Sequence, residues 1–397
     1  MATIEETTDL PLNLHEYEAA ARDLLSPLAL GYVSGGSCDE VTLRANRTAF
    51  DRWRLLPRVM RGLREASTAT TVLGQEVALP VLIAPSGLHR LAHDDGELAT
   101  IRGAHGAGTI YTMSTASTVP MDIISREGAP WWFQLYLFSD RGISRDLVER
   151  AAAAGASALV VTVDVPLLGR READERNRFS LPDGIVMANL QTPKHMLIPA
   201  TEGGSGLATY IGAVWEPALT WDDLDWLASL SPLPVIPKGI LHPEDAARAF
   251  DHGARAVIAS NHGGRQLDSA VASLDALPAV VEAVAGRGEI LLDGGIRRGT
   301  DVLKALALGA RAVLIGRPVY WGLAMGGESG VRHILELLRA ELALDLMLCG
   351  VASPAELTRE LLVLADTLVP VGGAGAAMDR ETTTARLSSQ GTKEVER

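Results

Sequence analysis

Residues 260–268 bring together side chains that could act on an acidic substrate. They read Ser-Asn-His-Gly-Gly-Arg-Gln-Leu-Asp and follow an apolar run. The imidazole of His262 is suited to moving a proton near neutral pH, and the guanidinium of Arg265 can hold a carboxylate through two parallel hydrogen bonds. The segment therefore predicts a site for an anionic substrate that gives up a proton. A polar loop that only caps a strand is the alternative.

Four polar residues lie at or just beyond the end of the apolar run over 159–163: Thr162, Asp164, Arg170 and Arg171. Asp164 could orient His262 and stabilise its charge, as the carboxylate of a catalytic triad does. Arg171 could supply a second clamp for the substrate. The alternative is a surface ion-pair cluster in which the two arginines meet Glu172 and Asp174.

Glycines and arginines follow the last two apolar runs, in Asp293-Gly294-Gly295-Ile296-Arg297-Arg298-Gly299 and Ile315-Gly316-Arg317-Pro318. Backbone amides exposed by glycine, together with an arginine, form the usual phosphate site after the last two strands of an α/β barrel. Both segments therefore predict a phosphate-binding site. As an alternative, the glycines serve only as turn residues.

Three further side chains end apolar runs. Lys238 closes the run over 234–238, where a fixed cation would stabilise negative charge on a reduced cofactor ring. Gln134 and Tyr136 end the run over 132–136 and offer an amide and a phenol to the same space. A surface lysine and a tyrosine that packs at the rim are the alternatives.

These residues need a scaffold that brings distant strand ends together. Eight short apolar runs have the length and the β-branched content of strands buried on both faces: 81–84, 109–113, 132–136, 159–163, 234–238, 256–260, 289–293 and 312–316. Helix-like stretches separate them: 96–107, 141–154, 243–251, 274–284 and 298–308. This alternation is typical of parallel α/β folds.

An internal echo supports the count of strands. Gly-Ala-Ser-Ala-Leu from Gly155, Gly-Ala-Arg-Ala-Val from Gly253 and Gly-Ala-Arg-Ala-Val from Gly309 each join a helix end to a strand. Eight such units predict a closed (β/α)8 TIM barrel, in which reactive residues lie at the carboxyl ends of the strands. A doubly wound open sheet is the alternative, but no GxGxxG follows the first strand to favour it.

The rest of the chain is expected to extend one barrel domain over residues 1–368. Residues 1–60 form a helical N-terminal extension in this prediction. Residues 169–220, rich in Gly, Pro, Asn and Thr, form a long lid loop after the fourth strand. Residues 369–397, rich in Gly, Ala, Thr and Ser, are expected to be a disordered tail.

The composition narrows the class of protein. With 47% hydrophobic and 21% charged residues, it suits an α/β enzyme. The net charge of -13 argues against an extended nucleic-acid surface, because neutralising phosphates needs an excess of Lys and Arg. With two cysteines we expect neither a disulfide framework nor a metal site. The N-terminus does not resemble a signal peptide, and no apolar stretch is long enough for a membrane anchor, so we expect a cytoplasmic protein.

Taken together, these motifs resemble the FMN-dependent 2-hydroxy acid oxidases and dehydrogenases, which include glycolate oxidase, lactate oxidase, mandelate dehydrogenase and 4-hydroxymandelate oxidase. The similarity runs from about residue 14 to residue 364. Its most specific motif is Ser-Asn-His-Gly-Gly-Arg-Gln-Leu-Asp, backed by Leu-Asp-Gly-Gly-Ile-Arg-Arg-Gly-Thr-Asp, Gln-Leu-Tyr and Gly-Arg-Arg-Glu-Ala-Asp.

The resemblance implies roles for the matching residues. His262 would be the base, supported by Asp164, while Arg171 and Arg265 hold the carboxylate and Tyr136 bonds to the reacting oxygen. FMN would contact Ala84, Pro85, Ser86, Ser114, Gln134, Thr162 and Lys238, and its phosphate would meet Asp293, Gly295, Arg297, Gly316 and Arg317. The substrate pocket would add Tyr32, Gly87 and Ala116. A homo-oligomer is also expected, and a tetramer would be compatible.

Three departures from the family pattern concern the substrate and the electron acceptor. Gly31 precedes Tyr32 where the family usually has an aromatic pair, so carboxylate binding depends more on the two arginines. Ala116 stands where short-chain members tend to carry tryptophan, which predicts a larger pocket for an aryl (S)-2-hydroxy acid such as mandelate or 4-hydroxymandelate, as in the mandelate-type branch. Gly87 stands where many oxidases have alanine.

The glycine at position 87 leaves the electron acceptor open. The favoured prediction is an oxidase that uses O2 and forms H2O2, since the segment after Gly184 does not resemble the membrane segment of quinone-linked mandelate dehydrogenases. A dehydrogenase or monooxygenase with poor O2 reactivity is the alternative. Two other rivals are a flavin-binding barrel without turnover and another FMN barrel, such as an isomerase or nucleotide dehydrogenase. A nucleotide dehydrogenase would need a nucleophilic cysteine on a barrel loop, but Cys38 and Cys349 do not lie at any predicted strand end.

Overall fold

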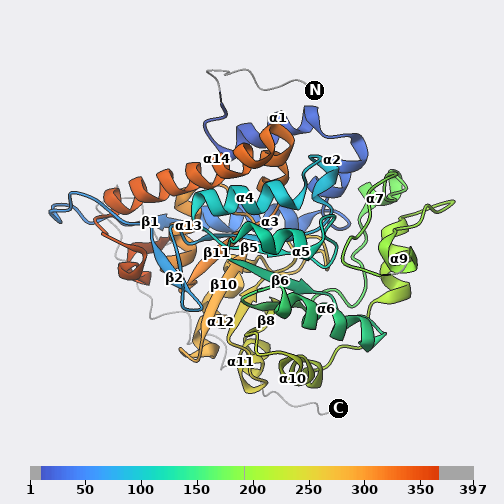
Figure 1. Cartoon of the computed structure of the whole chain (residues 1–397). Coiled ribbons are helices and arrows are strands. Elements are labelled where there is room, and N and C mark those ends of the chain that lie inside the picture. Colours follow the sequence, from blue (N-terminus) through green and yellow to red (C-terminus); the bar gives the residue numbers. More distant parts are fainter. Residues whose placement is uncertain (1–9, 192, 366–397) are drawn as a thin grey trace, which may run out of the picture.

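Eight parallel strands close into a barrel at the centre of the molecule (Figure 1). In chain order and in order around the barrel they are β4 (Val81–Ser86), β5 (Tyr111–Met113), β6 (Trp131–Leu135), β7 (Leu159–Thr162), β8 (Val235–Ile240), β9 (Ala256–Ala259), β10 (Glu289–Asp293) and β11 (Ala312–Ile315). The computed structural model describes residues 10–191 and 193–365. The predicted (β/α)8 barrel is confirmed.

Continuous apolar runs form these strands because both faces of the sheet are buried. In β4, Val81 and Ile83 belong to the layer between strands and helices, while Leu82 packs inside the barrel. All eight predicted runs became strands, and their ends differ by at most two residues. β4 and β8 each continue two residues beyond the predicted end, and each has a register shift against the next strand, between Ile83 and Ser86 and between Lys238 and Ile240.

Helices cover the outside of the barrel. They are α4 (Glu97–Ala107), α5 (Met121–Ile124), α6 (Arg141–Ala153), α10 (Trp221–Leu230), α11 (Pro243–Asp251), α12 (Ser273–Val284), α13 (Gly299–Ala307) and α14 (Arg317–Cys349), and α14 is broken at Gly326 and Gly327. The three echoed glycines, Gly155, Gly253 and Gly309, have φ values of 87°, 80° and 105°. They end helices in the left-handed region that glycine tolerates best.

The N-terminal extension is helical, as predicted, and ends in a strand. It contains α1 (Leu14–Leu24), α2 (Pro27–Ser34) and α3 (Val41–Thr48), and α1 packs along α14 (Figure 1). β1 (Trp53–Leu55) then pairs antiparallel with β12 (Leu362–Leu364). A hairpin of β2 (Thr70–Val72) and β3 (Gln75–Val77) follows. The sequence interpretation missed these three-residue strands.

The segment predicted as a loop over 169–220 contains three short helices. They are α7 (Glu172–Arg176), α8 (Pro193–Met196) and α9 (Gly206–Val214). In α9, Leu207, Tyr210, Ile211 and Val214 are buried at a helical spacing. The segment is therefore partly ordered by its own packing. Its role as a lid stays a prediction, as does the single domain over 1–368, and the tail predicted over 369–397 lies outside the described residues.

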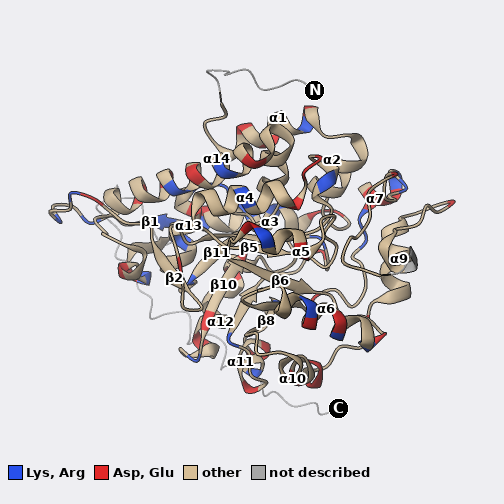
Figure 2. Cartoon of the chain, in the orientation of Figure 1, with Lys and Arg blue, Asp and Glu red and all other residues tan. Residues whose placement is uncertain are grey.

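Charged residues lie mainly on the outer helices, where acidic and basic side chains are interspersed (Figure 2). Within residues 10–191 and 193–365, no helix combines the length and apolar character needed to cross a lipid bilayer.

Candidate active site

A large cavity opens at the carboxyl ends of the barrel strands, with a volume of about 1160 Å³ including its mouth. Ligand pockets usually hold about 300–1000 Å³, so this one has room for a cofactor and a substrate together. Its wall contains most of the predicted site residues: Tyr32, Ala84, Pro85, Ser86, Gly87, Ser114, Ala116, Tyr136, Arg171, Lys238, His262, Arg265, Asp293, Gly295, Arg297, Gly316 and Arg317. The predicted Gln134, Thr162 and Asp164 do not line it.

His262 and Asp164 form a hydrogen-bonded pair at this mouth. The ring nitrogen Nδ1 of His262 lies 3.0 Å from Oδ1 of Asp164. The backbone of His262 has a φ of 58°, and its N–H donates to Ser260 Oγ at 3.0 Å. Behind the pair, Gly239 has a φ of 113°, and a Cβ there would lie 2.5 Å from Asp164 Cβ. Glycine at 239 therefore makes room for the carboxylate.

The charges of this pair follow from burial and neighbours. Burial lowers the pKa of His262 below its ordinary value, and Asp164 opposes this only in part. Burial alone would raise the pKa of Asp164, but His262 and Lys238 outweigh it, so the pKa lies below the ordinary value. A carboxylate only accepts hydrogen bonds, so Nδ1 of His262 holds the ring hydrogen. Nε2 is left with a free lone pair and can accept a proton.

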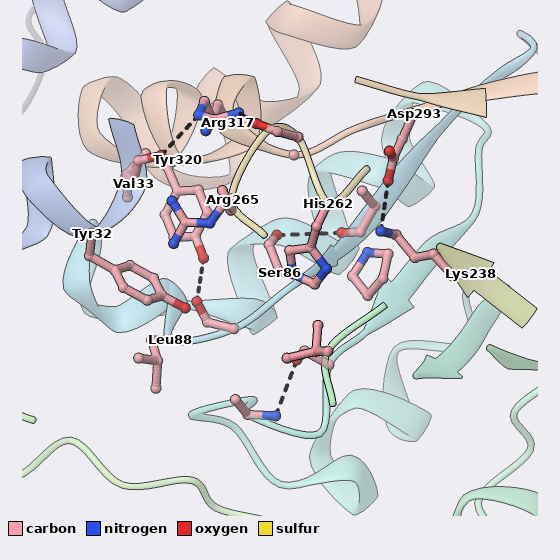
Figure 3. A pocket seen from close by; sticks show the side chains of 18 of the residues that line it. Tyr32, Val33, Ser86, Leu88, Lys238, His262, Arg265, Asp293, Arg317 and Tyr320 are labelled. Atoms are coloured by element: carbon pink, nitrogen blue, oxygen red, sulfur yellow. Dashed lines mark hydrogen bonds and ion pairs between the residues drawn. The ribbon is translucent and has the colours of Figure 1, made fainter. Parts of the chain in front are cut away.

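Lys238 is a buried cation in the wall, not a surface lysine (Figure 3). Its Nζ lies 2.9 Å from Asp293 Oδ2 and donates to Ser260 Oγ at 3.0 Å. Burial alone would lower the pKa of Lys238. The nearby carboxylates of Asp293 and Asp164 outweigh this effect, so the pKa lies above the ordinary value. The lysine therefore presents a fixed positive charge to the cavity.

The two adjacent arginines at 170 and 171 have separate environments. Arg170 is exposed and pairs with Glu175 at 3.0 Å. Arg171 is only 6% exposed, lines the cavity and lies 4.0 Å from Asp174. Burial, followed by the nearby Arg265, lowers the pKa of Arg171 to about 10. The alternative of a surface ion-pair cluster holds for Arg170, although its partner is Glu175. Arg171 does lie near the predicted Asp174, but both side chains are buried, so that pair is not on the surface.

Arg265 lies beside Tyr32 in the cavity wall (Figure 3). Its guanidinium carbon is 5.2 Å from the centre of the Tyr32 ring, and Nη1 donates to the Gly35 carbonyl at 2.8 Å. The glycine motif after His262 is sterically required, since a Cβ at Gly264 would lie 2.6 Å from the backbone of Leu43. The N-terminal extension therefore packs directly on the motif and fixes Arg265.

Arg297 and Arg317 lie at the end of the cavity where a phosphate is predicted. Arg317 begins α14 and donates to the carbonyls of Val33, Gly35 and Gly263 at 3.1, 3.1 and 2.9 Å. Burial lowers the pKa of Arg317 to about 9, and three neighbouring arginines add to this effect. Burial also lowers the pKa of Arg297 to about 10.

The wall therefore holds an excess of positive charge. Among the described residues, four arginines and Lys238 line it, and Asp293 is the acidic residue that lines it with them. Crowded, buried cations are stabilised by anions. A ligand with a phosphate at the arginine pair of 297 and 317, and a second one with a carboxylate near 171 and 265, would supply that charge.

Polar groups behind the wall connect β5, β6 and β7. Ser114 Oγ donates to Gln134 Oε1 at 3.1 Å, and Gln134 Nε2 donates to Thr162 Oγ1 at 2.9 Å. Oδ1 of Asp293 is buried and has no hydrogen-bond partner within the described part of the chain. A planar heteroaromatic ring beside Ser86, with ring N–H and carbonyl groups, matches this set of donors and acceptors.

Gly87 and Ala116 face each other closely at the cavity wall. A Cβ at Gly87 would lie 2.7 Å from Ala116 Cβ and 3.0 Å from its carbonyl oxygen. Leu88 N–H donates to that same carbonyl at 3.0 Å. Because a side chain at position 87 would clash with Ala116, glycine is needed there, and these two small residues leave space in the cavity.

Several lining residues were missed from the sequence. Tyr320, on the first turn of α14, donates its hydroxyl to the Gly87 carbonyl. The segment after β7 supplies an apolar wall: Val165, Leu168, Met187, Ile198, Leu207, Tyr210, Ile211 and Trp215. For α9 a signal existed, because apolar residues recur from 207 to 215 at spacings of three and four. Nothing local marks Tyr320, whose position depends on the closure of the barrel.

The cavity thus fits FMN. The guanidinium groups of Arg297 and Arg317 suit its phosphate, and Lys238 suits its ring, together with Ser114 and the hydrogen bonds behind it to Gln134 and Thr162. No group of three or more His, Cys, Asp or Glu residues in the described ranges is arranged to hold a metal ion.

Comparisons with known proteins agree with this geometry. A sequence model of the family described as FMN-dependent dehydrogenase matches residues 21–364. An L-lactate oxidase from Nostoc sp. is 53% identical over 359 residues, covering 89% of this chain and 98% of the relative. The 2-hydroxyacid oxidase 1 of Homo sapiens is 44% identical over 341 residues, covering 85% of this chain and 92% of the relative.

Solved structures give the same result for the fold. A mandelate oxidase with (S)-4-hydroxymandelic acid matches with a TM-score of 0.86 and 45% identity, covering 89% of this chain and 98% of that one. The family match includes all eight barrel strands and every predicted site residue. The chain therefore belongs to the FMN-dependent dehydrogenase family and is one of its FMN-dependent 2-hydroxy acid oxidases.

Proposed function

We propose that the protein oxidises an aryl (S)-2-hydroxy acid, such as mandelate or 4-hydroxymandelate, to the 2-oxo acid and passes the electrons to O2 to form H2O2. The main support is one cavity in which a neutral imidazole backed by a carboxylate faces two arginines and an apolar wall. Bound FMN would supply the two-electron chemistry.

The residues of the chain would bind the substrate and move its proton. Arg171 and Arg265 would hold the carboxylate, and the Tyr136 hydroxyl would bond to the reacting oxygen. His262 would accept one proton at Nε2, and Asp164 would stabilise the imidazolium. In this proposal a proton reaches His262 whether the Cα hydrogen leaves as a proton or as a hydride.

FMN would be held by most of the residues predicted for it. Ala84, Pro85 and Ser86 at the end of β4 would lie beside the ring, with Ser114 and Lys238 around it. Gln134 and Thr162, which do not line the cavity, would support Ser114 from behind through their hydrogen bonds. The phosphate would meet Gly295, Gly316, Arg297 and Arg317. Asp293 was predicted to meet the phosphate too, but its carboxylate pairs with Lys238 at 2.9 Å, so we assign it to holding that lysine in position. The charge excess of the wall supports this assignment.

An aryl side chain is supported by the apolar wall and by the absence of bulk at Ala116. The mandelate oxidase structure contains (S)-4-hydroxymandelic acid, which supports both an aryl group and the (S) configuration. A short substrate such as lactate is the second candidate, because the Nostoc relative, an L-lactate oxidase, is 53% identical.

The acceptor is proposed to be O2, because the relatives from Nostoc sp. and Homo sapiens are named oxidases. Because Gly87 stands where many oxidases have alanine, a dehydrogenase or monooxygenase with poor O2 reactivity is the alternative, and the experiment below distinguishes it. A cytoplasmic location and a homo-oligomer, with a tetramer as one option, also stay predictions.

Anaerobic mixing of the FMN-loaded protein with a panel of 2-hydroxy acids tests this proposal. The visible absorbance of the oxidised flavin should be lost fastest with (S)-mandelate or (S)-4-hydroxymandelate, and more slowly with (S)-lactate. Air should then restore the colour and yield one H2O2 per flavin. Fastest reduction by lactate would favour the second candidate. Slow reoxidation would indicate a dehydrogenase, and oxidative decarboxylation of the product would indicate a monooxygenase. If no acid bleaches the flavin, the protein is a flavin-binding barrel without turnover.

A further inference from the structure

A short antiparallel β-bridge joins the segment inserted after β7 to the residues that follow β6. Residues 214–216 pair antiparallel with residues 137–139, through backbone hydrogen bonds of 2.8 and 3.1 Å. Ser139 Oγ also donates to the Trp215 carbonyl at 3.1 Å. On the other side, the Trp215 N–H caps α9 by donating to the Ile211 carbonyl at 3.0 Å. Trp215 is therefore fixed from both directions.

This bridge places the indole of Trp215 on the ring of Tyr136. The ring centres are 3.8 Å apart and the planes differ by 14°. Tyr136 follows the last residue of β6, and its backbone N–H donates to Thr115 Oγ1 at 3.1 Å. The backbone of Tyr136 is thus held by the loop after β5, and its ring is held by the inserted segment. A stacked aromatic pair restricts both rings to one arrangement.

Trp215 also belongs to the cavity wall. It is 8% exposed and lines the cavity beside side chains of the same inserted segment: Met187, Ile198, Leu207, Tyr210 and Ile211. The hydroxyl of Tyr210 donates to the His195 carbonyl at 2.8 Å, which ties α9 to α8. This wall contacts Tyr136 through the stacked rings, and Ala116 lines the same cavity.

We propose that Trp215 is a specificity-determining residue, with an indole that holds the Tyr136 phenol in place and forms the surface against which the aryl group of the substrate packs. This inference rests on the proposed function. A flat ring gains contact area from a flat wall, whereas the methyl group of lactate is too short to use it. Trp215 would therefore affect mandelate in two ways and lactate only through Tyr136.

Three substitutions at this position separate aromatic from non-aromatic walls. Trp215→Phe keeps a flat ring, while Trp215→Leu and Trp215→Met remove it and Met preserves more of the volume. The expected result is a fall of about 10- to 100-fold in kcat/KM for (S)-mandelate with Leu or Met, a several-fold smaller fall for (S)-lactate, and near-complete rescue with Phe. Trp221→Leu is the matched control, because Trp221 stacks on His252 outside the cavity wall.

Binding of compounds that cannot react gives a readout independent of turnover. Phenylacetate and acetate lack the 2-hydroxyl group, and their binding is followed by the change in flavin absorbance. Trp215→Leu should weaken phenylacetate by about 10-fold or more and leave acetate nearly unchanged. Equal weakening of the two acids would contradict an aryl wall.

The effect through Tyr136 is tested in a double-mutant cycle with Tyr136→Phe. Trp215→Leu should slow lactate oxidation in the wild-type background and add little in the Tyr136→Phe background. Fully additive effects on lactate would overturn the positioning role. If the wild-type protein prefers mandelate but Trp215→Leu and Trp215→Met keep the same preference, the specificity role is wrong while the proposed function stands. If the wild-type protein oxidises neither acid, the proposed function itself has failed.

Discussion

Neutralising Asp164 isolates the contribution of its charge to the base. Asp164→Asn keeps the size of the side chain next to Gly239 but removes the charge that faces His262 at 3.0 Å. A hydrogen bond to a charged group contributes about 1.5–3 kcal/mol. At about 1.4 kcal/mol per tenfold in rate, flavin reduction by mandelate should slow about 10- to 150-fold.

The pH dependence should shift in a defined direction. Asp164 raises the pKa of His262, against the larger lowering effect of burial. Without that carboxylate the pKa of His262 falls further, so the acid limb of the rate profile moves to lower pH while the plateau falls. Stopped-flow reduction from pH 5 to pH 9 measures both quantities.

A matched control exists on the surface. His252 Nδ1 lies 2.9 Å from Oδ2 of Asp225, a carboxylate that is 56% exposed. Asp225→Asn removes the same type of bond away from the cavity and should leave the reduction rate unchanged. A wild-type rate and an unshifted acid limb in Asp164→Asn would refute the reasoning, provided that the variant binds FMN.

Asp164 should also contribute to stability above its unfolded pKa. Because its folded pKa is lowered, its contribution is complete above about pH 4 and is lost as the pH falls through the folded value. Denaturant unfolding as a function of pH should then show a weaker loss of stability below pH 4 in Asp164→Asn.

Three other substitutions give separable outcomes. Gly87→Ala should lower the free energy of unfolding by about 1–3 kcal/mol through its contact with Ala116, and Ala116→Gly should recover part of this in denaturant titrations; an unchanged midpoint for Gly87→Ala would contradict the packing. Lys238→Met leaves Asp293 buried without its cation and should lower the free energy of unfolding by about 3–5 kcal/mol in the same titration. An unchanged free energy of unfolding would show that the ion pair is dispensable. Ala116→Trp should reduce kcat/KM for mandelate roughly tenfold more than for lactate, and equal losses in steady-state assays would remove the pocket argument.

The barrel could be predicted because its information is local. Each strand is an apolar run buried on both faces, and glycines such as Gly155 and Gly309 mark where helices end. β1 and β12 could not be found in this way, because three residues are too short for a periodic pattern and their pairing joins chain ends some 300 residues apart.

The site could be predicted where the fold rule applies directly. His262 and Arg171 follow β9 and β7, and Lys238 lies near the end of β8; in a barrel these strand ends share one mouth. The rule cannot say which of two adjacent arginines turns inward, and the choice of Arg171 over Arg170 follows from the start of α7. Trp215 lies far from any barrel strand end and reaches the mouth only through the bridge to residues 137–139.

The most direct test is the reduction of FMN in His262→Ala under anaerobic conditions. The variant should bind FMN with the wild-type dissociation constant, because His262 faces the substrate side of the cavity in this account. Its flavin reduction by (S)-mandelate should be slower by about 10²–10⁴-fold. Reduction at close to the wild-type rate, with FMN fully bound, would contradict His262 as the base.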